Sequence, residues 1–140
     1  MRVKSMEAAW NYARQYYRGS AALQDFELLA KYCPDVFAGY MHMREGLFRE
    51  PRKGALSAKE KELILVGIEV SNRKTTSPPI GHTRRAIESG ATVDEVAQVV
   101  GLCVMLCGMI TYRESGRFVL QAAIDAADEQ ERQARGVDPA

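Results

Sequence analysis

The chain has 140 residues, which is enough for one domain with a sizeable core, and we expect a single domain over residues 1–140. Its 19 lysines and arginines nearly balance 18 aspartates and glutamates, so nothing favours nucleic acid or an anionic membrane as a partner. The N-terminal residues lack an apolar signal core, and three cysteines are too few and odd in number for a disulfide framework. These features predict a cytoplasmic protein.

Apolar residues recur at three- and four-residue intervals along the first third of the chain. This spacing predicts amphipathic helices over residues 5–18 and 21–32. Pro34 ends the second of these and can open a third helix, which runs to about residue 50. No alternating strand pattern occurs anywhere, and the whole sequence predicts an all-α fold of about seven helices.

Residues 56–96 carry the clearest local signals. Ser57 and Glu60 form a capping box that opens a helix, and residues 63–70 are apolar nearly all round, which predicts burial on most sides. Next comes a helix with Ser77 as its N-cap and His82 in its first turn, and it stops at Gly90.

A second capping box, Thr92 with Glu95, opens a helix over residues 93–107, and a last helix follows over about 111–132. A polar tail is expected from about residue 130. Phe118 is assigned to the inward face of the last helix, and Met105 and Met109 to irregular core space.

Cys103 and Cys107 are the closest pair of cysteines. Four residues apart on a helix, their Cβ atoms lie about 5–6 Å from each other, whereas a disulfide needs about 3.8 Å. Because the surrounding sequence is apolar, we expect both thiols to be buried and unreactive. The two histidines and three cysteines show no metal-ligand spacing, so neither a metal nor another cofactor is expected.

A family resemblance is carried by Glu62 with Leu63, by residues 82–92 (HTRRAIESGAT) and by residues 94–96 (DEV). In combination these motifs resemble the carboxymuconolactone decarboxylase family, which includes the alkylhydroperoxidase D-like proteins. The resemblance covers roughly residues 35–120. It implies a small all-α domain that assembles into trimers, hexamers or similar rings, and we expect a trimer-based homo-oligomer.

The resemblance also implies which residues could carry chemistry. The alkylhydroperoxidase branch uses two cysteines in the loop before the histidine, and Thr75 and Pro78 occupy those positions here. The decarboxylase branch usually has an acidic residue where Pro78 stands, so that feature is missing too. Glu62 and His82 remain as an implied acid–base pair, for which an imidazole is well suited at neutral pH. A purely structural role for His82 is the alternative.

Three further residues are candidates for substrate binding. Glu69 lies two turns after Glu62 on an apolar helix and could contribute to the site. Alternatively, one of these two glutamates faces solvent or meets an arginine across a subunit interface, for which Arg84, Arg85 and Arg113 are available. Tyr40 and His42, with Met43, could line an apolar small-molecule pocket beside His82, although core packing is the simpler role.

The leading functional hypothesis is a carboxymuconolactone decarboxylase-like lyase that acts on a small organic acid or lactone by acid–base chemistry. Whether the chain is an enzyme at all stays open. One alternative is an alkylhydroperoxidase or peroxiredoxin-type antioxidant protein, which the missing cysteines disfavour. Another is a binding or scaffold member of the family that lacks catalysis.

Overall fold

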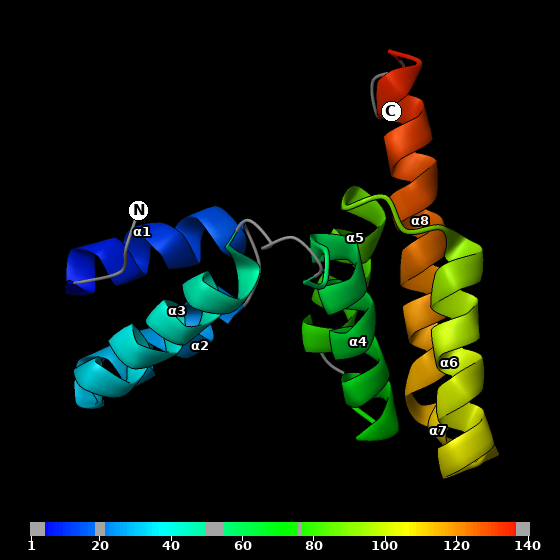
Figure 1. Ribbon diagram of the computed structural model, residues 1–140, viewed down its shortest axis with the longest axis horizontal. Coiled ribbons are helices and arrows are strands. Elements are labelled where there is room, and N and C mark those ends of the chain that lie inside the picture. The colour runs from blue at the N-terminus through cyan, green and yellow to red at the C-terminus, as the bar shows by residue number, and fades with distance from the viewer. Residues whose placement is uncertain (1–4, 19–21, 50–54, 76, 137–140) are drawn as a thin grey trace. The chain divides into compact units, whose positions relative to one another are not determined.

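The structure, a computed structural model, describes residues 5–18, 22–49, 55–75 and 77–136. All regular structure in these ranges is helical, which confirms the predicted all-α class. The chain divides into two compact units, Met1–Gly54 and Ala55–Ala140, and each is described by itself (Figure 1). The single domain over residues 1–140 therefore stays a prediction. Within the described ranges, every helix is too short or too polar to cross a membrane.

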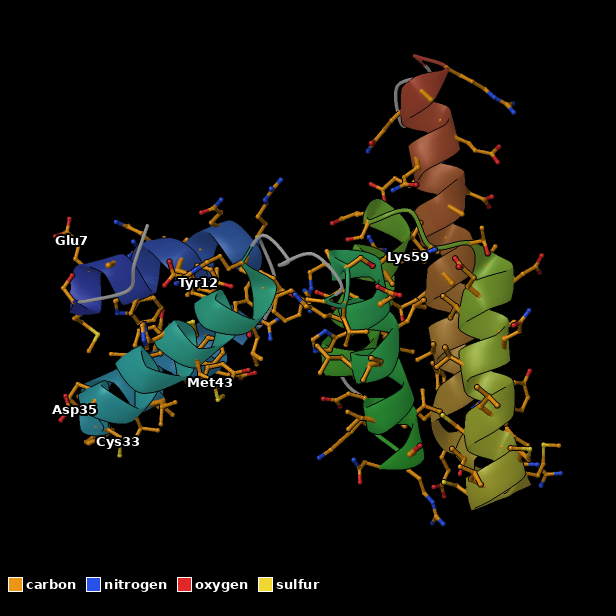
Figure 2. All side chains as sticks on the ribbon, in the orientation of Figure 1. Glu7, Tyr12, Cys33, Asp35, Met43 and Lys59 are labelled. Atoms are coloured by element: carbon orange, nitrogen blue, oxygen red, sulfur yellow. The ribbon has the colours of Figure 1, made fainter. Side chains whose placement is uncertain are left out.

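The first unit contains α1 (Met6–Tyr16), α2 (Ala22–Tyr32) and α3 (Pro34–Phe48), close to the three predicted helices. Helix α3 packs on both α1 and α2. The centre of the unit is formed by small residues of α1 and large residues of α3, namely Ala9, Ala13, Phe37 and Met41. Cys33 and Met43 are exposed, and Figure 2 shows their side chains pointing outward from this unit.

A buried arginine, Arg44, lies among the aromatic rings of the first unit. Its guanidinium carbon is 3.8 Å from the ring centre of Tyr16, 4.8 Å from that of Phe48 and 5.1 Å from that of Tyr17. Burial raises the pKa of Tyr17 above its ordinary value, and the charge of Arg44 only partly opposes this. The Tyr17 hydroxyl therefore stays protonated at neutral pH, and the arginine interacts with ring faces rather than with a phenolate.

The second unit begins with α4 (Ala58–Ser71), α5 (Ser77–Glu88) and α6 (Val93–Cys107). Helix α4 packs against both α5 and α6, and α8 (Arg117–Ala134) covers α5 and α6 (Figure 1). The core of the unit consists of Val66, Val70, Ala86, Ile87, Ala91, Val96, Val100, Cys103, Val119, Ala123 and Ala126.

Both predicted capping boxes are confirmed. The backbone N–H of Ser57 donates to Glu60 Oε2 at 2.6 Å, and that of Thr92 donates to Glu95 Oε2 at 2.9 Å. Each hydroxyl accepts in return from the glutamate backbone, at 3.2 Å and 3.1 Å. Lys59 Nζ lies 2.8 Å from Glu95 Oε1 and so ties the start of α4 to the start of α6.

The predicted stop at Gly90 is confirmed as well. Gly90 has φ +92°, and the backbone N–H of Ala91 reaches the carbonyl of Ala86 at 2.9 Å, which satisfies a carbonyl of the last turn of α5. The predicted N-cap role of the Ser77 side chain lies outside the described residues.

The last predicted helix differs from the structure. After α7 (Met109–Thr111), residues Tyr112–Gly116 form a π-helix, and α8 then continues to Ala134, beyond the predicted end. Ser115 is buried there and its hydroxyl donates to the carbonyl of Lys74. A Cβ on Gly116 would lie 2.6 Å from Val100 Cγ1, so a larger residue does not fit. The wider turn thus fastens the loop after α4 to the start of α8.

Several residues predicted to be buried are exposed in this chain. Met105 is 70% exposed, and Met109, Phe118 and Cys107 are exposed too, so their assignment to the core is wrong. Helix α6 is apolar on more than one face, and only the face that carries Cys103 packs into the core. The same applies to α4, where Ile64 and Ile68 are about half exposed although residues 63–70 predict burial on most sides.

The capping boxes make stability depend on pH. Hydrogen bonds from Ser57 hold the pKa of Glu60 below its ordinary value, and bonds from Lys59 and Thr92 do the same for Glu95. A lowered folded-state pKa contributes stability that is present above the unfolded-state pKa and is lost as pH falls through the folded-state pKa.

We therefore expect a Glu60→Gln/Glu95→Gln variant to be less stable than the wild type at neutral pH. The difference should shrink as the pH falls below about 4, where the wild-type carboxylates also become protonated. Urea unfolding midpoints across this pH range measure the effect. A difference that stays constant with pH would contradict it.

Candidate functional site

Glu62 is a buried carboxylate on the face of α4 that packs against α5. The residue is 2% exposed, and Val66 and Val70 follow it on the same face, both fully buried. A charged group held among such neighbours requires polar partners, because an unpaired charge is costly to bury. Two such partners come from α5.

His82 supplies the first partner. It is 8% exposed, and its Nδ1 lies 2.7 Å from Glu62 Oε2, so the two predicted residues are brought together. Because α5 begins at Ser77, His82 lies in the second turn of the helix, and its predicted place in the first turn is wrong. A contact of this length between a carboxylate oxygen and a ring nitrogen requires one proton between them.

Arg85 supplies the second partner. Its Nε donates to Glu62 Oε1 at 3.3 Å, and its Nη2 lies 3.1 Å from His82 Nδ1. From the sequence, Arg85 is one of three arginines that could meet Glu62 or Glu69. The available signal was its spacing, since residues three apart on a helix are neighbours on one face.

Glu69 is half buried two turns further along α4. Its Oε2 is buried, and among the described residues it has no hydrogen-bond partner. Of the arginines that the sequence offers, Arg84 lies 3.4 Å from Glu129 and Arg85 contacts Glu62. The substrate-binding role of Glu69 stays a prediction.

Tyr40 and His42 belong to the first unit. The Tyr40 hydroxyl lies 3.4 Å from that of Tyr17, and the exposed His42 has its Nδ1 3.9 Å from Glu45 Oε2. Their predicted part in binding substrate also stays a prediction.

The cysteines lie in three different settings. Cys103 is buried and its thiol donates to the carbonyl of Gly67 at 3.3 Å, whereas Cys33 and Cys107 are exposed. Within the described ranges, histidines, cysteines and carboxylates do not gather in groups of three that could hold a metal ion.

A surface groove of about 490 Å³ runs between α4 and α6. It is lined mostly by apolar side chains, with Ser71, Asn72 and Cys103 as its polar members. The apolar lining consists of Leu63, Ile64, Gly67, Ile68, Val99, Leu102 and Leu106. Neither Glu62 nor His82 lines this groove, so it is separate from the buried pair.

Comparisons with known proteins point in one direction. Residues 34–122, more than half of the chain, match the carboxymuconolactone decarboxylase family. One solved structure is similar, with a TM-score of 0.70 and 26% identity. It is the crystal structure of a protein from Burkholderia xenovorans LB400 that is provisionally named a carboxymuconolactone decarboxylase. The similarity covers 94% of this chain and 99% of that one. Curated protein sequences give no significant match.

The contact between Glu62 and His82 should be visible as an energetic coupling. We expect His82→Ala to destabilise the unit by about 1–3 kcal/mol, because it leaves a buried carboxylate without one of its partners. Glu62→Ala/His82→Ala should cost less than the sum of the single changes, since neither partner is then left alone. Urea unfolding of the four proteins in this cycle gives the coupling. Additive effects would show that the contact contributes nothing.

Proposed function

From the membership of this chain in the carboxymuconolactone decarboxylase family, we infer that it binds a small organic acid or lactone and acts on it by acid–base chemistry. His82 is the group that exchanges a proton with the substrate, and Glu62 is the carboxylate that orients the imidazole. The observation that carries this proposal is the 2.7 Å contact between Glu62 Oε2 and His82 Nδ1 in a buried setting.

We expect different tasks for the two ring nitrogens. Nδ1 is engaged by Glu62, whereas Nε2 makes no hydrogen bond within the described part of the chain. A carboxylate on one ring nitrogen fixes the orientation of the ring and leaves the other nitrogen for the substrate. Nε2 is therefore the atom that exchanges the proton.

A decarboxylation at such a site has a simple balance. The bond between the carboxylate and its carbon breaks, carbon dioxide leaves, and the electron pair remains on a carbon conjugated with a carbonyl group. That carbon then takes a proton, which Nε2 of the neutral imidazole first accepts, from the acid group of the substrate or from solvent, and then delivers. A buried histidine next to a carboxylate suits this step because its position does not change as the proton moves.

The antioxidant alternative has weaker support. Thiol peroxidases need an exposed, activated cysteine with a second one close by. Thr75 and Pro78 stand where the family's cysteines would be, and the buried Cys103 is hydrogen bonded to a backbone carbonyl. For a non-catalytic member of the family, the buried pair would be purely structural.

Ligand binding and turnover test the proposal together. We expect small carboxylates or lactones to raise the melting temperature of the wild type, because ligands that bind only the folded state stabilise it. His82→Gln should abolish turnover of whichever compound is found, while Arg84→Gln, an exposed change on the same helix, should not. Turnover that survives in His82→Gln would refute the acid–base role.

Self-association is a second part of the proposal. Seven large apolar side chains of α4, α6 and α7 are between 43% and 81% exposed in the isolated chain: Ile64, Ile68, Leu102, Met105, Leu106, Met109 and Ile110. Ile64, Ile68, Leu102 and Leu106 line the groove between α4 and α6, so these four form one connected surface. Soluble monomers rarely expose apolar patches of this extent. We propose that this face is covered by further copies of the chain, in a trimer-based assembly as the family resemblance implies.

Light scattering tests the assembly. The wild type should have a mass several times the 15.6 kDa of one chain, and Leu106→Lys should shift it toward the monomer by placing a charge on the proposed interface. Asp128→Lys, an exposed change on α8, serves as the control and should leave the mass unchanged. A monomeric wild type at micromolar concentration would rule the assembly out.

A further inference from the structure

We propose that Arg85 is the positioning residue of this site: by balancing the charge of Glu62, it keeps the His82 ring neutral, with its proton on Nδ1 and the lone pair of Nε2 available as a base. The proposal deepens the acid–base function and rests on it for its catalytic meaning. Its structural content, the charge state of three side chains, can be tested without any substrate.

Arg85 reaches both members of the pair from one place. It lies three residues after His82 on α5, with Nε 3.3 Å from Glu62 Oε1 and Nη2 3.1 Å from His82 Nδ1. The side chains of Glu62 and Arg85 are 3% and 18% exposed, so water screens their interaction far less than it would at the surface.

The shared proton must reside mainly on Glu62 or on the ring. An arginine only donates, so it favours the ionised form of a carboxylate beside it. With the proton on the ring, Glu62 Oε2 accepts from Nδ1 and Oε1 accepts from Arg85, so each oxygen has a donor. With the proton on Glu62, the guanidinium would lie beside a neutral acid. The first arrangement is favoured.

With the proton on the ring, the contact between Arg85 Nη2 and His82 Nδ1 is a charge interaction and not a hydrogen bond. When Nδ1 carries the proton, Nη2 faces an N–H and does not form a hydrogen bond with it. A guanidinium 3.1 Å from the ring opposes a second positive charge there, so it disfavours imidazolium. Glu62 alone would favour imidazolium. The two effects oppose each other, and Glu62, His82 and Arg85 together are neutral with a neutral ring.

Gly81 leaves the space in which the guanidinium lies. A Cβ at this position would be 3.3 Å from Arg85 Nη1 and 3.6 Å from Nη2. Its φ does not lie in the left-handed region, so the backbone does not require a glycine. Alanine at position 81 would therefore press on the guanidinium without changing any charge, which provides a second way to disturb Arg85.

Nitrogen NMR of the imidazole reads the charge state directly. In the wild type at neutral pH we expect one protonated ring nitrogen, Nδ1, and one unprotonated, Nε2. Arg85→Met removes a positive charge from beside the buried pair, so the site should take up a proton more readily and the signal of unprotonated Nε2 should weaken or be lost. Arg85→Lys keeps a positive charge and should retain the signal. Gly81→Ala should weaken it.

Controls separate this effect from unfolding. Arg84→Met removes an equal charge from the exposed side of the same helix and should keep the wild-type spectrum. The two histidines of the chain are distinguished by recording His42→Gln, which leaves only the His82 signals. If the melting curve shows that Arg85→Met does not fold, the Nε2 signals of Gly81→Ala and the wild type are compared instead, and this comparison decides the test.

Two results would overturn the proposal: a wild-type ring protonated on Nε2, or an unchanged Nε2 signal in both Arg85→Met and Gly81→Ala. Where a substrate is found, Arg85→Met should lower kcat about tenfold or more with little change in KM, and Arg85→Lys should restore most of it. If the NMR signals behave as expected but no carboxylate or lactone is turned over, the positioning role holds and the proposed function fails.

Discussion

A carboxylate that is almost completely removed from water determines how α4 and α5 meet. Glu62 could not remain charged in that position without donors for both of its oxygens, and α5 provides them through His82 and Arg85. Each helix therefore limits the movement of the other through these polar contacts as well as through packing. Displacing α5 along α4 by one residue would separate the donors from the acceptors and leave buried charges unpaired.

Local signals in the sequence were sufficient for most of the secondary structure. Ser57 with Glu60 and Thr92 with Glu95 satisfy each other's backbone groups within four residues, so no distant part of the chain decides whether these helix starts form. Gly90 likewise ends α5 by its own conformational freedom. The pairing of Glu62 with His82 was available only through the family resemblance, because nothing in the spacing of 20 residues indicates contact.

Other features depend on which surfaces meet in space. Periodicity shows that α6 is apolar on more than one face, but it does not tell which face enters the core, and so Cys107 and Met105 were assigned wrongly. In the π-helix, the Ser115 hydroxyl donates to the carbonyl of Lys74, 41 residues away, a contact that the local sequence does not indicate. Arg85 could have met either of two glutamates, and only the three-dimensional arrangement selects Glu62.

The site is built from two consecutive helices and a short loop, which has a consequence for how the protein folds. The contacts of Glu62 with His82 and Arg85 span 20 and 23 residues, so closing the chain between them costs little entropy compared with more distant contacts. Short-range contacts of this kind form rapidly, and we expect the hairpin of α4 and α5 to assemble early and to guide the docking of α6 and α8. The chemistry and the folding nucleus of the second unit would then share the same residues, and a change that harms one would slow the other.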